Sequence, residues 1–477
     1  MATSVKTKPD MSQAKFTKGS TMQHVITMTA TGAVGMIAVF MVDLANLFYI
    51  SLLGEKALAA AIGYASTIMF FATSVCIGFT IAATAITAKA LGKGDIELAK
   101  KEASVSLVFV FIATSIISLL MMLNIKPLLS VIGAKGETLQ IAYEYMLIAV
   151  PSIPLMGLAM CMAGLLRAKG DAKRAMYIPL IAAIFGAMLD PILIFYYDLG
   201  VNGAAISMIF ARIIFVIVGL HGVAVIHKLL SVPTWQDIKR VFVPFMVIGF
   251  PSLLTQVSTP FGNAYVTSAI ADFGDDAVAG WAVIGRLIPL AFAATFSLSG
   301  AVGPILAQNY GAGLVDRITQ AMKDSLLFII IYMGAMWALL AIGHDLIIQI
   351  FGATGDGALL IEIFCFYVAG LFGFTAILFV ANAAFNNLGN PFLSTAFNWG
   401  RATIGIIPFV WVGAQWGASG VLIGWALGGT LFGLAAIIVC FRTLKKLPER
   451  AENEGIIVHH TPAISHSPFS SGKSAGM

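Results

Sequence analysis

Two acidic residues stand inside long apolar stretches of the chain. Asp43 lies in MVDLANLF and Asp190 lies in AMLDPILIF. A carboxylate near the centre of a membrane costs about 2.5 to 3.5 kcal/mol on insertion scales, unless it is protonated, paired or hydrated. Two carboxylates that share an apolar site cannot both ionise cheaply. The pair therefore predicts a site that takes up and releases a proton or another cation.

Two further residues belong to this predicted coupling site. Tyr145 lies in another apolar stretch, and its phenol reaches the depth of the two acids if that stretch runs in the opposite direction. Pro191 follows Asp190, and a proline removes one backbone N–H and disfavours the helical conformation of the residue before it. We therefore expect a helix break at Pro191 that leaves a carbonyl free for a cation, a water molecule or a hydroxyl. A purely structural cluster of hydrogen bonds would use the same residues.

The composition shows which elements hold these residues. Of the 477 residues, 59% are hydrophobic and only 11% are charged, whereas a soluble domain carries about 25% charged residues. Apolar runs of about 20 residues are long enough to cross a bilayer as helices. The sequence therefore predicts an all-α polytopic membrane protein with twelve transmembrane helices, at approximately 24–49, 57–86, 103–123, 138–162, 176–196, 201–226, 244–270, 277–304, 324–342, 358–383, 394–414 and 418–441.

The distribution of basic residues predicts the orientation of these helices. Most Lys and Arg residues stand in the N-terminal tail, in alternate loops and after residue 441, while the intervening loops hold only Lys56, Lys126 and Lys135. Cytoplasmic loops of membrane proteins are rich in Lys and Arg. We therefore expect both termini to be cytoplasmic.

Three landmarks of the first half recur in the second half, 217 to 219 residues later. The matching pairs are Gly92 with Gly311, Gly170-Asp171 with Gly389-Asn390, and GVNG at 200–203 with GASG at 417–420. An even number of spans in each copy makes the copies parallel. We expect two pseudo-symmetric six-helix lobes around a central cleft. The predicted domains are an N-terminal cytoplasmic tail (1–21), an N-lobe (22–226), a cytoplasmic linker (227–243), a C-lobe (244–443) and a C-terminal cytoplasmic tail (444–477) that we expect to be disordered.

The central cleft is the expected site for the transported molecule. Candidate lining residues of this cavity are Met36, Phe40, Met69, Gln256, Phe261 and Asn263. Met and aromatic side chains make adaptable contacts with flat, lipophilic cations. Packing against lipid explains most of the 21 Met and 33 Phe residues, and hydrogen bonds between helices explain Gln256 and Asn263 equally well. Arg212, Arg286 and Arg401 also fall within spans, where bracing of helices or snorkelling to an interface is the expected role.

Several classes of protein are excluded by missing motifs. The sequence has no GxxxxGKS or GxxxxGKT phosphate loop and no HExxH metal motif. It has no run of five or six basic residues that would bind nucleic acid. Its four cysteines lie in apolar stretches without CxxC spacing. We therefore expect no enzyme, no cofactor and no nucleic-acid partner, but transport driven by an ion gradient.

The sequence resembles the MATE family of multidrug and toxic compound extrusion transporters over about residues 22 to 443. The matching stretches include VDLANLFYISLLGEKALAAAIGYAS at 42–66, LDPILIFYYDLGVNGAAIS at 189–207, and VGPILAQNYGAG at 302–313. The resemblance implies a monomeric twelve-helix antiporter of the plasma (inner) membrane that expels organic cations and drugs in exchange for H+ or Na+. Asp43 and Asp190 resemble the DinF-like branch, which couples transport at an N-lobe site that includes a tyrosine matching Tyr145.

Two departures from the DinF-like pattern favour H+ over Na+ as the coupling ion. Gly186 stands where many members have Asn, and Met208 follows Ser207 where they often have Thr. Both changes remove oxygen ligands from a possible Na+ site at Asp43 and Asp190, and hard cations need several oxygens. Two alternatives to antiport stay open: a flippase for a lipid-linked or amphiphilic cargo, and a passive channel or membrane scaffold.

Overall fold

The computed structural model describes residues 11–51 and 56–459, and its regular elements are helices. In the first half they are η1 (Met11–Gln13), η2 (Lys15–Thr17), α1 (Thr21–Ser51), α2 (Lys56–Gly92), α3 (Ile96–Leu123), α4 (Ile125–Val131), α5 (Gly136–Ala149), η3 (Val150–Ser152), α6 (Ile153–Ala168), α7 (Ala172–Pro191), η4 (Ile192–Tyr196), α8 (Gly200–Leu220) and η5 (His221–Ile226). The outer parts of the two predicted tails, residues 1–10 and 460–477, lie outside the described residues.

The second half repeats this helical organisation. Its elements are α9 (Trp235–Ala271), α10 (Asp275–Ala291), α11 (Ala293–Gly311), α12 (Val315–Phe351), α13 (Gly355–Ile363), η6 (Phe364–Val368), α14 (Ala369–Asn387), α15 (Pro391–Gly400), η7 (Arg401–Gly405), α16 (Ile407–Gly413), η8 (Ala414–Trp416), α17 (Gly417–Lys445) and α18 (Leu447–Asn453). The elements η4 to η7 are π-helical, and the other η elements are 3-10 turns.

The described residues contain enough apolar helix for twelve membrane crossings. Ten helical stretches pass by length and composition, or eleven if α10 and α11, which meet at a 48° bend, form one span. One of the ten stretches, Pro391–Lys445, has 55 residues, whereas one crossing needs about 20. Inside it the chain turns back near Trp416, so that Gly413 of α16 packs against Gly420 of α17. Division at this turn gives the predicted number of crossings.

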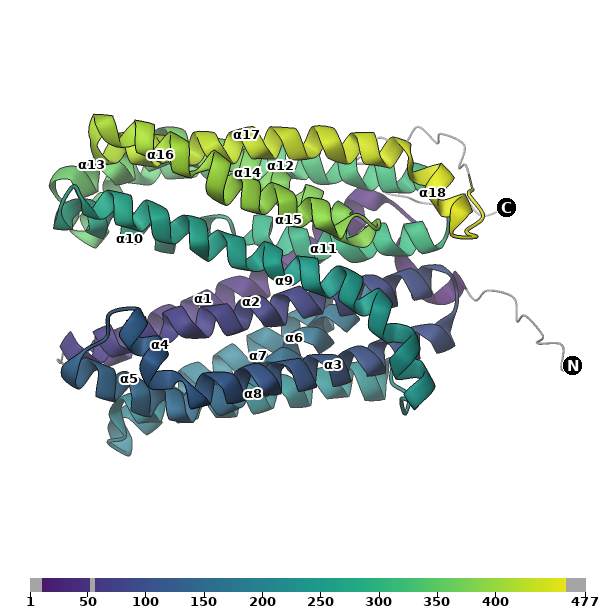
Figure 1. Ribbon diagram of the computed structural model, residues 1–477, viewed down its shortest axis with the longest axis horizontal. Helices are drawn as coiled ribbons and strands as arrows, with labels where there is room; N and C mark the ends of the chain where they lie inside the picture. The colour runs from purple at the N-terminus through teal and green to yellow at the C-terminus, as the bar shows by residue number, and fades with distance from the viewer. Residues whose placement is uncertain (1–10, 52–55, 460–477) are drawn as a thin grey trace, which may run out of the picture.

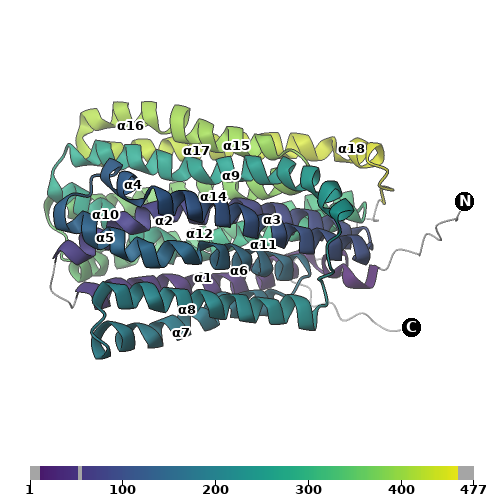
Figure 2. The ribbon, with the colours of Figure 1, turned by 60° about the horizontal axis from the view of Figure 1, so that its bottom comes forward.

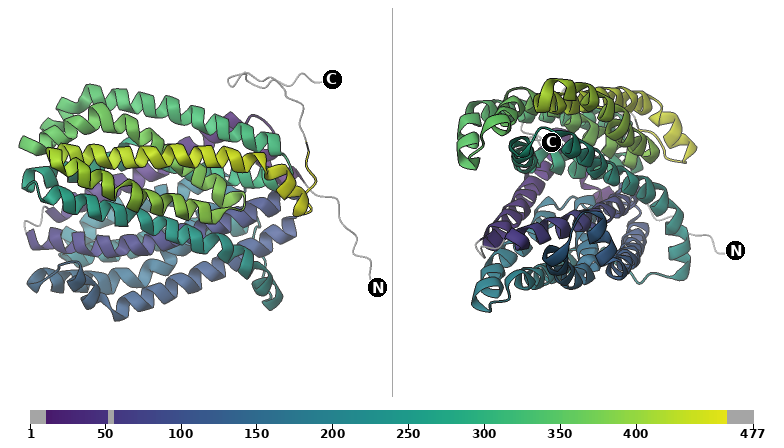
Figure 3. Two further views of the ribbon diagram at one scale, coloured as in Figure 1. Left: turned by 45° about the horizontal axis from the view of Figure 1, so that its top comes forward. Right: turned by 60° about the vertical axis from the view of Figure 1, so that its left-hand side comes forward.

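The two halves of the chain form two helical bundles that lie side by side (Figure 1). The first bundle contains the helices from α1 to α8, with α7 and α8 adjacent to each other (Figure 2). In the second bundle α17 runs along most of the length (Figure 3). The first and last described residues lie at the same end of the molecule, which we call the terminal end (Figure 1). There, the N–H of His459 donates to the carbonyl of Gly313.

The seam between the bundles is built by α1 and α2 on one side and α9 and α11 on the other. A Cβ atom on Gly78 of α2 would lie 2.7 Å from backbone atoms of Leu253 on α9, so only glycine permits this close approach. The hydroxyl of Ser297 on α11 donates to the carbonyl of Thr29 on α1 at 2.9 Å. The helix backbones of the two bundles therefore approach each other closely along this seam.

The sequence landmarks occupy equivalent places in the two halves. Gly92 ends α2 and Gly311 ends α11. Gly170 and Gly389 both stand in the turn before a helix, and both have positive φ, 82° and 86°. Glycine adopts this left-handed conformation without the steric cost that a side chain brings. The repeat predicted from the sequence thus coincides with a repeat of helix boundaries.

The expected helix break at Pro191 is wrong. Pro191 has φ −63° and ψ −28°, and Asp190 before it stays inside α7. The helix widens instead into the π-helical turn η4, in which the N–H of Tyr197 donates to the carbonyl of Ile192 at 3.0 Å. Proline has no N–H to donate to the preceding turn, and here the chain stays helical on both sides of it.

Two predicted irregular segments contain more helix than expected. Helix α9 begins at Trp235, inside the predicted linker 227–243, because Thr234 and Asp237 form a reciprocal capping box. In the C-terminal tail expected to be disordered, α17 extends to Lys445 and α18 follows. Leu447 and Ala451, four residues apart, are buried. These apolar contacts hold a segment whose polar composition suggests disorder.

Candidate functional site

The two intramembrane acids come from neighbouring helices of the first bundle. Asp43 lies on α1 and Asp190 lies near the end of α7, and the two helices pack side by side. Asp190 is 2% exposed, whereas Asp43 is exposed in the protein. The carboxylates are close enough to repel each other electrostatically. The structure therefore brings the two residues together, one accessible and one enclosed.

Tyr145 belongs to the same cluster. It lies on α5, is 9% exposed, and is within electrostatic range of both carboxylates. Arg212 of α8 is also within range of this phenol. Its guanidinium donates to the hydroxyl of Ser152 and to the carbonyl of Ala149. Arg212 thus braces α8 against the η3 turn, as the sequence suggests.

Ser207 is a member of the cluster that the sequence did not single out. Its side chain is buried on α8 and forms a hydrogen bond with the Asp190 carboxylate. The Gly186 carbonyl is 3.5 Å from the same hydroxyl, at the outer limit for such a bond. A hydroxyl has a single proton, so the carboxylate is its better acceptor. The available signal was a small polar residue in the span that follows Asp190.

Gly186 leaves the space beside the acids open. A Cβ atom there would meet only Ala211 and Val42, at 3.7 and 3.9 Å, which is ordinary packing distance. A larger polar side chain would therefore need little rearrangement at this position. The described residues contain no group of three or more His, Cys, Asp or Glu side chains suited to a metal ion.

The six residues expected to line a substrate cavity lie on three helices along the seam: Met36 and Phe40 on α1, Met69 on α2, and Gln256, Phe261 and Asn263 on α9. Met69 is buried at 9% in the packed core that also contains Tyr145, so it does not line an open cavity in this conformation. Phe261 is 46% exposed and its ring lies 5.4 Å from that of Trp399.

The second bundle buries a cation of its own. Arg401, in the π-helical turn η7, is 4% exposed and donates through Nη2 to the Thr259 hydroxyl at 3.2 Å. Its Nε and the indole N–H of Trp425 have no hydrogen-bond partner. Both side chains border a narrow gap, next to Phe372 and Thr375, that has no room for a water molecule. Buried donors without partners are rare in folded proteins.

The three basic residues within the predicted spans therefore differ. Arg212 is buried and braces the first bundle. Arg286 of α10 is exposed. Arg401 is the one of the three that combines burial with an unpartnered donor.

Comparison with known proteins identifies the family. The MatE family model matches residues 32–192 and again residues 251–412, two segments that begin 219 residues apart. This offset equals that of the sequence landmarks. The two matched segments together cover more than half of the chain.

Characterised relatives resemble the chain over most of its length. A protein of Shewanella oneidensis named FAD transporter is 27% identical over 428 residues, which cover 87% of this chain and 94% of the relative. Multidrug export protein MepA of Staphylococcus aureus is 25% identical and covers 89% of this chain and 95% of its own length.

Solved structures share the same fold. The Vibrio cholerae MATE transporter VcmN in the bent form has a TM-score of 0.84 at 24% identity and covers 90% of this chain and 98% of its own. A MOP superfamily transporter from Pyrococcus furiosus, described as having reverse polarity of its binding pocket, has a TM-score of 0.86 at 20% identity, with 91% and 98% coverage. The chain belongs to the MatE family: it is a multi-pass, all-helical membrane transporter and not an enzyme.

Proposed function

We propose that this transporter is a secondary antiporter of the plasma membrane that exports lipophilic organic cations in exchange for protons, with both termini cytoplasmic. The observation that carries the proposal is the cluster of Asp43, Asp190 and Tyr145 inside the membrane-spanning part of the first bundle. Placement of the acids in this half also supports assignment to the DinF-like branch. The multidrug export proteins among the relatives support the substrate class.

Charge repulsion between the two carboxylates provides a physical basis for coupling. When both carboxylates are ionised, they repel each other and favour a cation nearby. Protonation of a carboxylate removes that preference. An ion drives transport only if the conformations of the protein bind it with different affinities. The Asp43 side chain is exposed at the surface of the bundle and that of Asp190 is enclosed, so a movement of α1 against α7 would change the exposure of one acid relative to the other.

The oxygen atoms around the acids favour H+ over Na+. Besides the two carboxylates, the cluster contains the hydroxyls of Ser207 and Tyr145, while Gly186 has no side-chain oxygen and Met208 has only a thioether. A dehydrated hard cation needs about six oxygen ligands. A proton needs only one carboxylate at a time, so this cluster suits a proton better.

The mechanism is tested by neutralising the acids one at a time. Asp43→Asn and Asp190→Asn should each abolish resistance to cationic dyes in cells that express the protein. Glu144→Gln is the matched control, because Glu144 is exposed beside Tyr145 and its carboxylate accepts a hydrogen bond from Gln140 in the same helix. Protein amounts in the membrane are measured alongside. Normal resistance with Asp43→Asn would remove this residue from the mechanism.

A second candidate substrate class is an anionic aromatic molecule such as a flavin nucleotide. Opening of the closed gap at Arg401 in another conformation would offer such a molecule an unpartnered buried donor and the aromatic rings of Trp425 and Phe372, and the relative named FAD transporter supports the same class. An intramembrane cation is costly unless it serves a ligand or a partner. Arg401→Gln should then lower flavin export by on the order of tenfold, the loss of one charged hydrogen bond, and leave export of cationic dyes intact. Equal loss of both activities would indicate a structural role for Arg401.

A further inference from the structure

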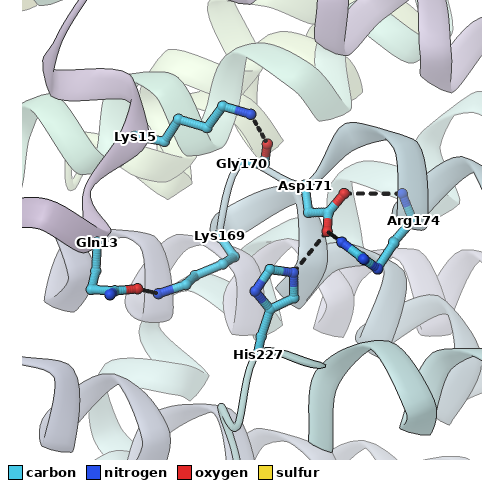
Figure 4. Close-up of polar contacts among 7 residues, drawn as sticks. All are labelled: Gln13, Lys15, Lys169, Gly170, Asp171, Arg174 and His227. Atoms are coloured by element: carbon cyan, nitrogen blue, oxygen red, sulfur yellow. Dashed lines mark hydrogen bonds and ion pairs between the residues drawn. The ribbon is translucent and has the colours of Figure 1, made fainter. Parts of the chain in front are cut away.

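A cavity of about 460 Å³ opens at the terminal end of the molecule. Three segments that are far apart in the sequence border it: the N-terminal residues 12–15, the turn between α6 and α7, and His227 after η5. Figure 4 shows the polar contacts of this region: Lys15 reaches Gly170, Lys169 meets Gln13, and Asp171 contacts Arg174 and His227. The cavity is separate from the cluster of intramembrane acids and takes no part in the mechanism proposed above.

The lining of this cavity is predominantly basic. Lys15, Lys169 and Arg174 each bring a positive charge, while Asp171 is the one acidic residue among the described lining residues. Asp171 contacts both Arg174 and His227. Partial burial works to raise the pKa of Asp171, but the hydrogen bonds from Arg174 and His227 prevail and hold it below its usual value. One ionised carboxylate thus faces several cations.

Neutral groups position the lysine that comes from the N-terminal segment. The Lys15 ammonium donates to the carbonyl oxygen of Gly170 at 2.9 Å. A carbonyl orients an ammonium group but does not neutralise it, and the group has three donors. Gln13 accepts a hydrogen bond from Lys169 in the same region. The side chains are therefore pre-arranged across the cavity by contacts that leave a net positive charge at Lys15.

We propose that this cavity binds a phosphate group, carried either by a soluble phosphate compound or by the headgroup of an anionic lipid. Arginine offers a planar fork of donors that matches phosphate oxygens, and lysine adds a point charge. A water molecule takes about 30 Å³ of the liquid, so the cavity has room for a phosphate, its bridging waters and part of an attached group. We expect this end of the molecule to be cytoplasmic, where both sources of phosphate occur.

Binding here would act on the seam between the bundles. Phe16, next to Lys15, is 1% exposed and reaches the second bundle: its N–H donates to the Gln308 side chain at 2.9 Å. Its carbonyl accepts hydrogen bonds from Asn309 at 3.2 Å and from Arg317 at 3.0 Å. A phosphate that joins Lys15 to Arg174 would tie this segment to the first bundle as well.

The consequence for transport rests on the proposed alternating access, whereas the binding itself does not. A ligand stabilises whichever conformation binds it more tightly. With the N-terminal segment held on both bundles, phosphate would favour the state in which the terminal end is closed.

The proposal is tested on the full-length protein in detergent by calorimetric titration with sodium phosphate at constant ionic strength. Lys15→Gln and Arg174→Gln should each weaken binding by on the order of tenfold. Lys173→Gln is the matched control: it removes the same charge one residue away, from an exposed side chain outside the cavity lining. Its affinity should stay within about twofold of the wild type, because only contact with the ligand carries a large effect.

A second arm distinguishes the source of the phosphate. The melting temperature is compared in nanodiscs of pure phosphatidylcholine and in nanodiscs that contain phosphatidylglycerol. A lipid headgroup is supported if phosphatidylglycerol stabilises the wild type and Lys173→Gln but not Lys15→Gln or Arg174→Gln. A soluble compound is supported if inorganic phosphate binds in the titration and phosphatidylglycerol does not stabilise the protein. The proposal is overturned if neither probe binds, or if Lys173→Gln weakens binding as much as the two cavity variants do.

Discussion

At the scale of single residues, the sequence pointed to the acids because a charge in an apolar run is costly and therefore conspicuous. It could not show that Asp190 is enclosed while Asp43 is exposed, since exposure depends on which neighbouring helix covers each face. Ser207 was named only within a departure from the family pattern and not as a site residue, because a serine in a membrane span costs little. Met69, a candidate for the cavity, is packed in a core cluster here, and its residue type could not decide between the two because a methionine suits a core and a binding surface equally.

Asp171 allows the charge of a residue to be separated from its role in helix capping. It caps α7 by accepting from the N–H of Arg174, and asparagine caps a helix about as well. Asp171→Asn should therefore lose only the charged contacts to Arg174 and His227, which we put at about 1 kcal/mol because Arg174 is partly exposed. A lower melting temperature at pH 7, by about 1 °C for a chain of 477 residues, is the expected result.

The pH dependence of this effect has a definite sign. Because the folded-state pKa of Asp171 lies below the ordinary value of 3.8, its contribution is present at neutral pH and fades as the pH falls below about 4. The difference in melting temperature between wild type and Asp171→Asn should therefore persist while Asp171 is ionised and shrink as the pH falls below about 4. Asp198→Asn, at an exposed site, serves as the control. A difference that grows with acidity would contradict the assignment.

At the scale of helices, apolar runs predicted the crossings well because a bilayer sets both the length and the composition of a span. Details of the helices were less predictable. A π turn rather than a break follows the proline after Asp190, since a helix in a membrane retains as many backbone hydrogen bonds as it can. Helix α18 formed where composition suggested disorder, because Leu447 and Ala451 found a surface on which to pack.

The contact between α2 and α9 can be tested with a pair of glycines on one helix. Gly78→Val places a side chain against the backbone of Leu253, so the two bundles must separate at the seam. We expect destabilisation of about 1 to 3 kcal/mol from overpacking and loss of transport. Gly63→Val makes the same change on α2 at a position with no atom within 4 Å of the added Cβ. The melting temperatures and dye resistance of both variants are compared.

The comparison of Gly78→Val with Gly63→Val isolates the contact between α2 and α9. Gly63→Val controls for the change in helix propensity and hydrophobicity, which the two substitutions share. If Gly78→Val behaves like Gly63→Val in stability and in transport, the seam is not closely packed at this point in the working protein.

At the scale of the whole molecule, two bundles related by an internal repeat could be expected from three short landmarks. Turns repeat more visibly than spans because they need glycine at particular backbone conformations, as Gly170 and Gly389 do, whereas an apolar span accepts many sequences. The contacts between the two bundles could not be predicted from the sequence. They join distant residues, such as Phe16 with Gln308 and Ser297 with Thr29.

In the proposed mechanism, two carboxylates in the first bundle couple export of a cation to entry of protons. The most direct measurement places purified protein in vesicles and records movement of a cationic dye under an imposed pH gradient, an imposed Na+ gradient, or neither. We predict uphill movement with the pH gradient alone, and none for Asp190→Asn. Dye movement that is insensitive to both gradients would contradict antiport and indicate a passive pathway, while dependence on Na+ alone would contradict the choice of proton.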